Sequence, residues 1–115
     1  MGNQMTEMLK GTLEGIVLAI LARMPAYGYE ITAWLRDRGF SDIAEGTIYA
    51  LLVRVEQRGF VDVKKVPSEK GPPRKVYSLN AKGRDQLAEF WGTWTVLAER
   101  IEQLHHTDNR HDEGA

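Results

Sequence analysis

Residues 44–60, AEGTIYALLVRVEQRGF, constrain the fold of this chain more than any other stretch. Their branched apolar residues recur with the period of an α-helix and would share one face of it: Ile48, Leu51, Leu52 and Val55. Gly59 suits a left-handed C-terminal cap, so the helix should end there and the chain should continue as an extended segment. The stretch therefore predicts a helix with one buried face and one free face.

The free face of this helix carries small side chains toward its N-terminal end and a cation toward its C-terminal end. A projection at about 100° per residue places Gly46, Ala50, Val53, Arg54 and Gln57 opposite the apolar face, with Thr47 and Tyr49 on its flanks. A helix of this kind, ended by glycine and followed by a strand, is typical of the recognition helix in a winged helix-turn-helix. A core helix with a solvated outer face is the alternative.

Two further helices are expected before this one. Residues 12–24 carry an apolar stripe that Thr12 can cap and that Pro25 ends. Residues 30–38 have apolar residues at i, i+3 and i+4, and Gly39 would end that helix. Short links join the three segments, so we expect a trihelical core.

Beyond Gly59 the pattern favours two strands, at residues 60–66 and 74–79, joined by a loop rich in proline and glycine. Between Asp62 and Lys75 the chain has more cations than anions, and its local charge is +3 on a chain whose formal net charge is -1. The cations of this segment are Lys64, Lys65, Lys70, Arg74 and Lys75. A basic hairpin after such a helix is typical of a wing that contacts DNA phosphates. A solvated hairpin kept soluble by its lysines is the alternative.

Composition sets further limits. A chain of 115 residues has room for one domain, and its near-neutral charge means that nucleic-acid binding would depend on a local basic patch. The absence of cysteine excludes disulfides and thiolate metal sites. No apolar run is long enough to span a membrane, and the first eight residues lack a signal-peptide pattern. We therefore expect a soluble, unexported protein, compatible with a cytoplasmic location and with no membrane partner.

Asn80 can cap a last, long helix over residues 80–104. Its apolar residues step alternately by four and three, which predicts a continuous seam that a trihelical core is too small to cover. We expect the same helix of a second subunit to cover it, giving a two-fold symmetric homodimer held by Leu87, Phe90, Leu97, Ile101 and Leu104. Residues 105–115 have no periodicity and no large apolar residue, and are expected to form a disordered tail.

Trp91 and Trp94 have two interpretations. They can simply be dimer core, or, facing residues as small as Ala98, they can leave a flat slot for a planar aromatic ligand. Other chemistry has little support: the three histidines near the C-terminus lack a carboxylate scaffold, and no catalytic or phosphate-binding motif is present. We therefore expect no metal, no cofactor and no enzymatic activity.

Four motifs in order resemble the PadR family of bacterial transcriptional regulators: residues 13–18 (LEGIVL), 27–31 (YGYEI), 46–49 (GTIY) and 71–79 (GPPRKVYSL). The resemblance extends over about residues 9–104, and the single short C-terminal helix is similar to the compact branch of the family, which has multidrug-binding members. It implies a mainly α fold with a small β-hairpin (α+β), divided into a winged helix-turn-helix at 1–79, a dimerisation helix at 80–104 and the tail at 105–115.

The resemblance also implies a function. It is that of a dimeric repressor that binds a pseudo-palindromic double-stranded DNA operator and is released by a small aromatic effector. Thr47, Tyr49, Ala50 and Arg54 would approach the major groove, with Thr47 and Tyr49 on phosphates and Arg54 on either a phosphate or a base. By position, Trp94 matches the tryptophan that stacks on planar drugs at the dimer centre; the second indole of Trp91 and the intervening Gly92 depart from that pattern. A winged-helix protein-interaction dimer without DNA binding is the alternative.

Overall fold

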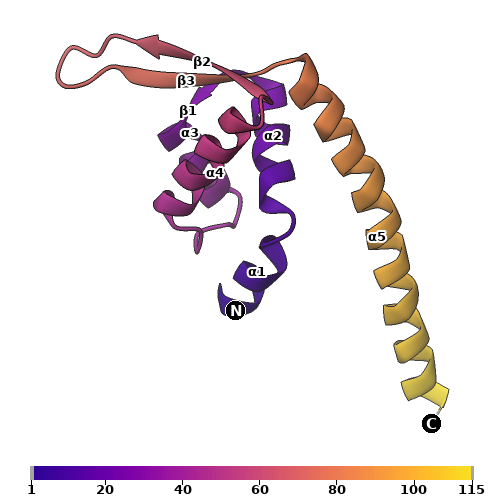
Figure 1. Ribbon diagram of the computed structural model, residues 1–115. Coiled ribbons are helices and arrows are strands. Elements are labelled where there is room, and N and C mark those ends of the chain that lie inside the picture. Colours follow the sequence, from indigo (N-terminus) through magenta and orange to yellow (C-terminus); the bar gives the residue numbers. More distant parts are fainter. Residues whose placement is uncertain (1, 115) are drawn as a thin grey trace.

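The computed structural model describes the backbone of residues 2–114 and the side chains of residues 4–107. The elements in chain order are α1 (Gly2–Leu9), α2 (Leu13–Arg23), β1 (Ala26–Tyr27), α3 (Gly28–Asp37), α4 (Glu45–Gln57), β2 (Val61–Val66), β3 (Arg74–Leu79) and α5 (Ala81–Gly114). The strands form one antiparallel sheet in the order β1-β3-β2 (Figure 1). The predicted fold class, mainly helical with a small β element, is confirmed.

The core lies where α2, α3 and α4 meet the sheet. Its fully buried side chains come from all three helices: Val17, Leu18, Ile31, Leu35, Ile48, Leu52 and Val55. Glycine ends two of the helices as predicted, with φ of 92° at Gly39 and 79° at Gly59. After Gly59, the Phe60 amide donates to the Val55 carbonyl oxygen at 3.0 Å, which satisfies a carbonyl at the end of α4 before the chain enters β2. The trihelical core and the strand after it are confirmed.

Two short elements were not predicted. The strand β1 has two residues between Pro25 and Gly28, and it pairs with β3 in the register Ala26↔Tyr77 and Tyr27↔Val76. The helix α1 precedes the stretch in which the first helix was expected, and Leu9 at its end is buried in the core. The strand is too short for a periodic pattern to reveal it, and α1 has only three apolar residues, Met5, Met8 and Leu9.

The helix α5 begins as predicted, because the Asn80 side-chain oxygen accepts the Gly83 amide at 2.9 Å. Its end differs from the prediction, since the helix continues to Gly114 rather than ending near Leu104 before a disordered tail. The segment 105–113 contains no proline or glycine, and the Thr107 hydroxyl donates a hydrogen bond to the Gln103 carbonyl oxygen one helical turn earlier, at 2.9 Å. The last residue, Ala115, lies outside the described residues.

The molecule is elongated because α5 extends well past the other helices (Figure 1). Its extents are 66 × 30 × 20 Å and its radius of gyration is 17.4 Å, against about 13 Å for a compact domain of this length. The hairpin β2–β3 lies at the end of the molecule where α5 begins, and its loop projects past α3 and α4 on the side away from α5 (Figure 1). Among the described residues, no helix has the length and apolar character needed to cross a membrane.

Candidate nucleic-acid interface

The outer face of α4 is open, as its sequence predicted. Ile48, Leu52 and Val55 are buried, whereas Leu51 is only half-buried. The residues expected on the free face and its flanks are all exposed: Gly46, Thr47, Tyr49, Ala50, Val53, Arg54 and Gln57. The middle of this face therefore carries small or neutral side chains that can approach the floor of a groove closely.

The two flanks of α4 meet different neighbours. On one flank, Thr47 and Leu51 line a mostly apolar surface pocket of about 360 Å³, which also includes Leu13 of α2. On the same flank, the Arg54 Nε lies 3.4 Å from one carboxylate oxygen of Glu14 on α2. The predicted DNA contact by Arg54 thus has a competing acidic partner within the protein.

On the other flank, three tyrosines come together where α3, α4 and the sheet meet. The rings of Tyr27 and Tyr29 stack with centroids 5.7 Å apart, and the Arg74 guanidinium lies 5.8 and 5.6 Å from the two centroids. Tyr49 of α4 lines the same surface pocket of about 490 Å³ as both rings and Arg74. We call Tyr27, Tyr29, Tyr49 and Arg74 the tyrosine cluster.

Gly28 allows the Tyr49 ring of this cluster to approach the backbone closely. A Cβ atom on Gly28 would lie 2.5 Å from Cε1 of Tyr49, so any larger residue there would displace the tyrosine ring. The sequence predicted that Tyr49 is exposed beside the free face of its helix, but it treated residues 25–29 as a link and residues 27–31 as a family motif, without a role for Tyr27 and Tyr29. The signal that was available is the YGY motif itself, in which a glycine between two tyrosines allows a neighbouring ring to approach closely.

The wing is the β2–β3 hairpin, and its five predicted cations, Lys64, Lys65, Lys70, Arg74 and Lys75, are all exposed. In the sheet register Lys65 lies directly opposite Lys75, on the same face as the pair Val63↔Tyr77. Like charges directly opposite each other destabilise a sheet, so this pair favours an anionic partner. The Lys75 Nζ also lies 3.8 Å from the Glu56 carboxylate, which places that cation beside α4.

Tyr77 connects the wing to the core. Its side chain is buried at the centre of β3, opposite Val63. Burial raises the pKa of its hydroxyl above the usual value of 10.0, and the nearby Glu56 and Tyr49 raise this pKa further. Tyr77 therefore stays neutral at physiological pH and acts as a packing residue under the interface.

The structure divides the predicted dimerisation residues into two groups. Leu87 is buried in the core of its own subunit, and the Phe90 ring packs so closely on Gly15 of α2 that a Cβ there would lie 2.3 Å from the ring. Leu87 is therefore covered by its own chain, which corrects the prediction that places it in a subunit interface, whereas Phe90 is half-buried and its contact with a second subunit stays a prediction. The other three, Leu97, Ile101 and Leu104, are exposed.

The reason for the division is helix length. At about 1.5 Å per residue, the 11 residues of α2 can cover only the first third of the 34-residue α5. From the end of that third onward the helix is less covered: Trp91 and Trp94 are 46% and 43% exposed, and Ala98 is half-buried. The two indoles of the isolated chain are therefore not part of its own core.

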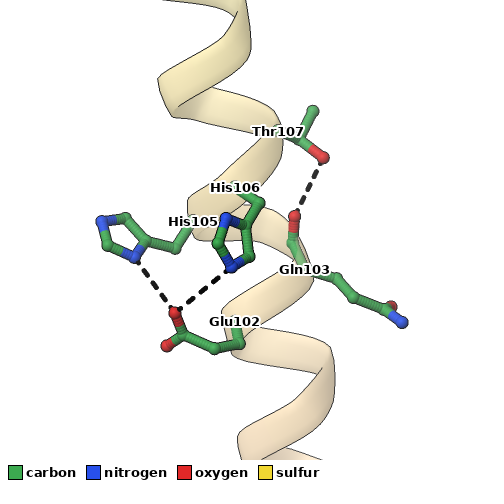
Figure 2. A network of polar contacts seen from close by, with 5 residues as sticks. All are labelled: Glu102, Gln103, His105, His106 and Thr107. Atoms are coloured by element: carbon green, nitrogen blue, oxygen red, sulfur yellow. Dashed lines mark hydrogen bonds and ion pairs between the residues drawn. The ribbon is translucent and has the colours of Figure 1, made fainter.

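The histidines near the end of α5 form a small polar network (Figure 2). One carboxylate oxygen of Glu102 lies 3.4 Å from Nδ1 of His105 and 3.9 Å from Nε2 of His106. All three side chains are exposed, and the described residues contain no group of three side chains placed to hold a metal ion. His111 lies outside the described side chains.

Comparison with known proteins agrees with this arrangement. The profile of the transcriptional regulator PadR-like family matches residues 17–89. A PadR-like transcriptional regulator from Bacillus cereus is 38% identical, with a TM-score of 0.75 over 85% of this chain and 95% of its own. A Streptococcus transcriptional regulator is 39% identical, with a TM-score of 0.75 over 84% of this chain and 95% of its own. A PadR family regulator from Eggerthella lenta is 33% identical, with a TM-score of 0.80 over 89% of this chain and 88% of its own. The chain therefore belongs to the PadR-like family of transcriptional regulators.

Proposed function

We propose that this chain is a homodimeric repressor that binds a pseudo-palindromic operator in double-stranded DNA and is released from it by a small planar aromatic effector. The observation that carries the proposal is the placement of cations. The wing presents an opposed pair of lysines, Lys65 and Lys75, next to the open face of α4. A polyanion that lies across both elements offsets the repulsion within this pair.

In this proposal, phosphate contacts supply most of the affinity. They come from the wing cations and from the tyrosine cluster, whose Arg74 and hydroxyl groups lie beside the groove-facing helix. Sequence preference comes from the small outer face of α4, where Ala50 and Val53 can contact base edges. Thr47 and Tyr49 bind phosphates at the start of α4.

The dimer and the effector are proposed from the uncovered part of α5. Leu97, Ile101 and Leu104 form an apolar stripe that a second copy of the helix can cover. Trp91, Trp94 and Ala98 lie at the N-terminal end of that stripe, so an aromatic compound bound there would touch both subunits. It can lower DNA affinity only by as much as it prefers the dimer arrangement that does not fit the operator.

The experiment is the replacement of Lys64, Lys65, Arg74 and Lys75 by alanine, followed by DNA binding over a range of salt concentrations. The operator is first obtained by selection from random double-stranded DNA. We expect weaker binding, and a slope of log affinity against log salt that falls by about one unit for each phosphate that the variant no longer neutralises. Lys10→Ala is the matched control, because Lys10 is an exposed cation next to α1 that pairs with Glu7 at 2.9 Å.

Two results would count against the proposal. A quadruple variant with the affinity and salt slope of the parent removes the wing from DNA binding. A parent protein that binds no double-stranded DNA at low salt favours the alternative, a winged-helix dimer that binds another protein.

A further inference from the structure

The Glu14 carboxylate contacts two arginines at the same time. Arg54 is in α4, and Arg58 is the C-terminal cap residue of that helix. One carboxylate oxygen accepts a hydrogen bond from Nη1 of Arg58 at 2.6 Å, and the other lies 3.4 Å from Nε of Arg54. The Glu14 side chain is only 18% exposed, whereas that of Arg54 is 64% exposed. A partly buried carboxylate thus binds two cations that remain within reach of solvent.

The positions of these residues explain why the contact forms. Arg54 and Arg58 are four residues apart, so they are neighbours at the end of α4 and repel each other. Glu14 lies in the first turn of α2, where the helix dipole favours a negative charge. The Arg58 guanidinium is fixed further by the Phe60 ring, whose centroid is 4.7 Å away. The carboxylate therefore offsets a repulsion that α4 would otherwise carry.

The same contact turns Arg54 away from the groove-facing surface. Arg54 is seven residues after Thr47, so both lie on the flank of α4 that faces α2. The centre of the outer face is left to Ala50, Val53 and Gln57, which carry no charge. While a cation on this flank is paired with Glu14, its charge is partly neutralised and it is less available to a DNA phosphate.

We propose that Glu14 is a positioning residue that holds Arg54 and Arg58 against α2 and withholds both cations from the DNA backbone. The inference rests on the proposed DNA-binding function. Its consequence is that the protein binds DNA less tightly than its arginines allow, so that uncharged side chains of α4 contribute a larger share of the recognition. Loss of the carboxylate should raise affinity for any DNA sequence. The ratio of operator affinity to random-DNA affinity should gain less than either affinity does.

The test is a double-mutant cycle. Glu14→Gln keeps the shape of the side chain and removes its charge, and we expect it to tighten binding to random double-stranded DNA on the order of tenfold at low salt. The slope of log affinity against log salt should steepen by about one to two units, one for each arginine that gains a phosphate. In an Arg54→Gln, Arg58→Gln background, Glu14→Gln should change neither quantity.

Two comparisons separate this role from simpler ones. Glu45→Gln makes the same change of charge at the start of α4, and its effect on DNA binding should persist when both arginines are replaced, because the ion pairs of Arg54 and Arg58 are with Glu14. Melting temperatures of all variants, with Glu14→Ala as a second variant, report whether the fold is intact.

The possible outcomes are distinct. If Glu14→Gln still raises DNA affinity after both arginines are replaced, the effect comes only from the general electrostatic field of the protein and the inference is overturned. An unchanged DNA affinity in a folded Glu14→Gln variant overturns it as well. A parent and a Glu14→Gln variant that both fail to bind DNA overturn the proposed function and this inference with it. A parent that binds DNA, with a gain that depends on the arginines, supports both.

Discussion

At the scale of single residues, long-range pairing decides which side chains are available for binding. The sequence predicted the exposure of Arg54 correctly but not its partner, because Glu14 is 40 positions earlier in the chain and helical periodicity says nothing about ion pairs between helices. The wing cations were easier to predict, since local composition alone identified them. The stacking of Tyr27 on Tyr29 was not predicted, because Tyr27 is placed by β1, a two-residue strand that leaves no pattern.

Tyr77 gives a prediction about alkaline stability. The pKa of its hydroxyl is higher in the folded chain than the usual 10.0, because the site is buried and Glu56 and Tyr49 lie nearby. Well below the usual pKa of 10.0 the phenol is neutral in both states, so its full contribution to stability is present. As the pH rises through that value, the unfolded chain releases this proton more readily than the folded one, and the free energy of unfolding falls.

Tyr77→Phe should therefore lose less stability than the parent between about pH 9 and pH 11, measured by urea unfolding at fixed protein concentration. The difference in slope is the result to compare, because the substitution can also change stability at neutral pH. Parallel curves for parent and variant over this range would mean that the Tyr77 hydroxyl titrates alike in the two states.

At the scale of the elements, the helical pattern predicted α2, α3, α4 and the start of α5, since each has several apolar residues in one stripe and a cap or breaker at its end. It failed where one pattern has two kinds of neighbour. Leu87 and Phe90 belong to the same seam as Ile101, yet the first two pack within the subunit and Ile101 is exposed. A periodic pattern identifies an apolar face but not which part of it the rest of the chain covers.

Two glycines of α5, one tightly packed and one open to solvent, allow a matched test of how α5 packs. A Cβ on Gly83 would lie 2.1 Å from the Phe60 carbonyl oxygen, a backbone atom that cannot move freely, whereas a Cβ on Gly92 meets no neighbouring atom within 4 Å. Gly83→Ala should destabilise the fold by about 1–3 kcal/mol through overpacking. Gly92→Ala should stabilise it by up to about 1 kcal/mol, because alanine is the better helix former.

Urea unfolding at one protein concentration measures both effects, since the stability of a dimer depends on concentration. If Gly92→Ala instead lowers the unfolding free energy, the backbone at this position is in close contact with a second subunit. If Gly83→Ala is neutral, α5 moves away from Phe60 at little cost and the start of the helix is less firmly packed than the distances indicate.

At the scale of the whole molecule, the uncovered length of α5 gives a prediction about assembly. Leu97→Glu with Ile101→Glu would place two unpaired charges in an apolar seam at a cost of several kcal/mol, so sedimentation should show monomers. Val96→Glu is the control, because Val96 and Leu97 are both 46% exposed but Val96 lies about 100° away from Leu97 around the helix. A dimer that survives the double change, or one that Val96→Glu also disrupts, would mean that another surface joins the subunits.

The tryptophans of α5 give the last prediction, which concerns the effector. A Trp34→Phe background removes the indole of α3, so that the remaining fluorescence reports Trp91 and Trp94 alone. Planar cationic dyes at micromolar concentration should quench this fluorescence and lower DNA affinity. Trp94→Ala should abolish most of the dye binding, because two symmetric indoles around one ligand contribute about 1–3 kcal/mol, or roughly one to two decades of affinity.

The choice between a ligand site and a plain dimer core depends on comparing the two indoles. Trp94 is 43% exposed in the isolated chain, so Trp94→Ala should leave the fold of each subunit intact, which the melting temperature checks. The Trp91 ring lies 5.2 Å from that of Phe90, which is packed on α2, so Trp91 is the indole nearer to its own subunit. Dye affinity that is unchanged in Trp91→Ala places this ring outside the slot, whereas a gain shows that it partly fills the slot. A background protein that binds no dye, together with a Trp94→Ala variant that is monomeric, would show that both indoles serve only to join the subunits.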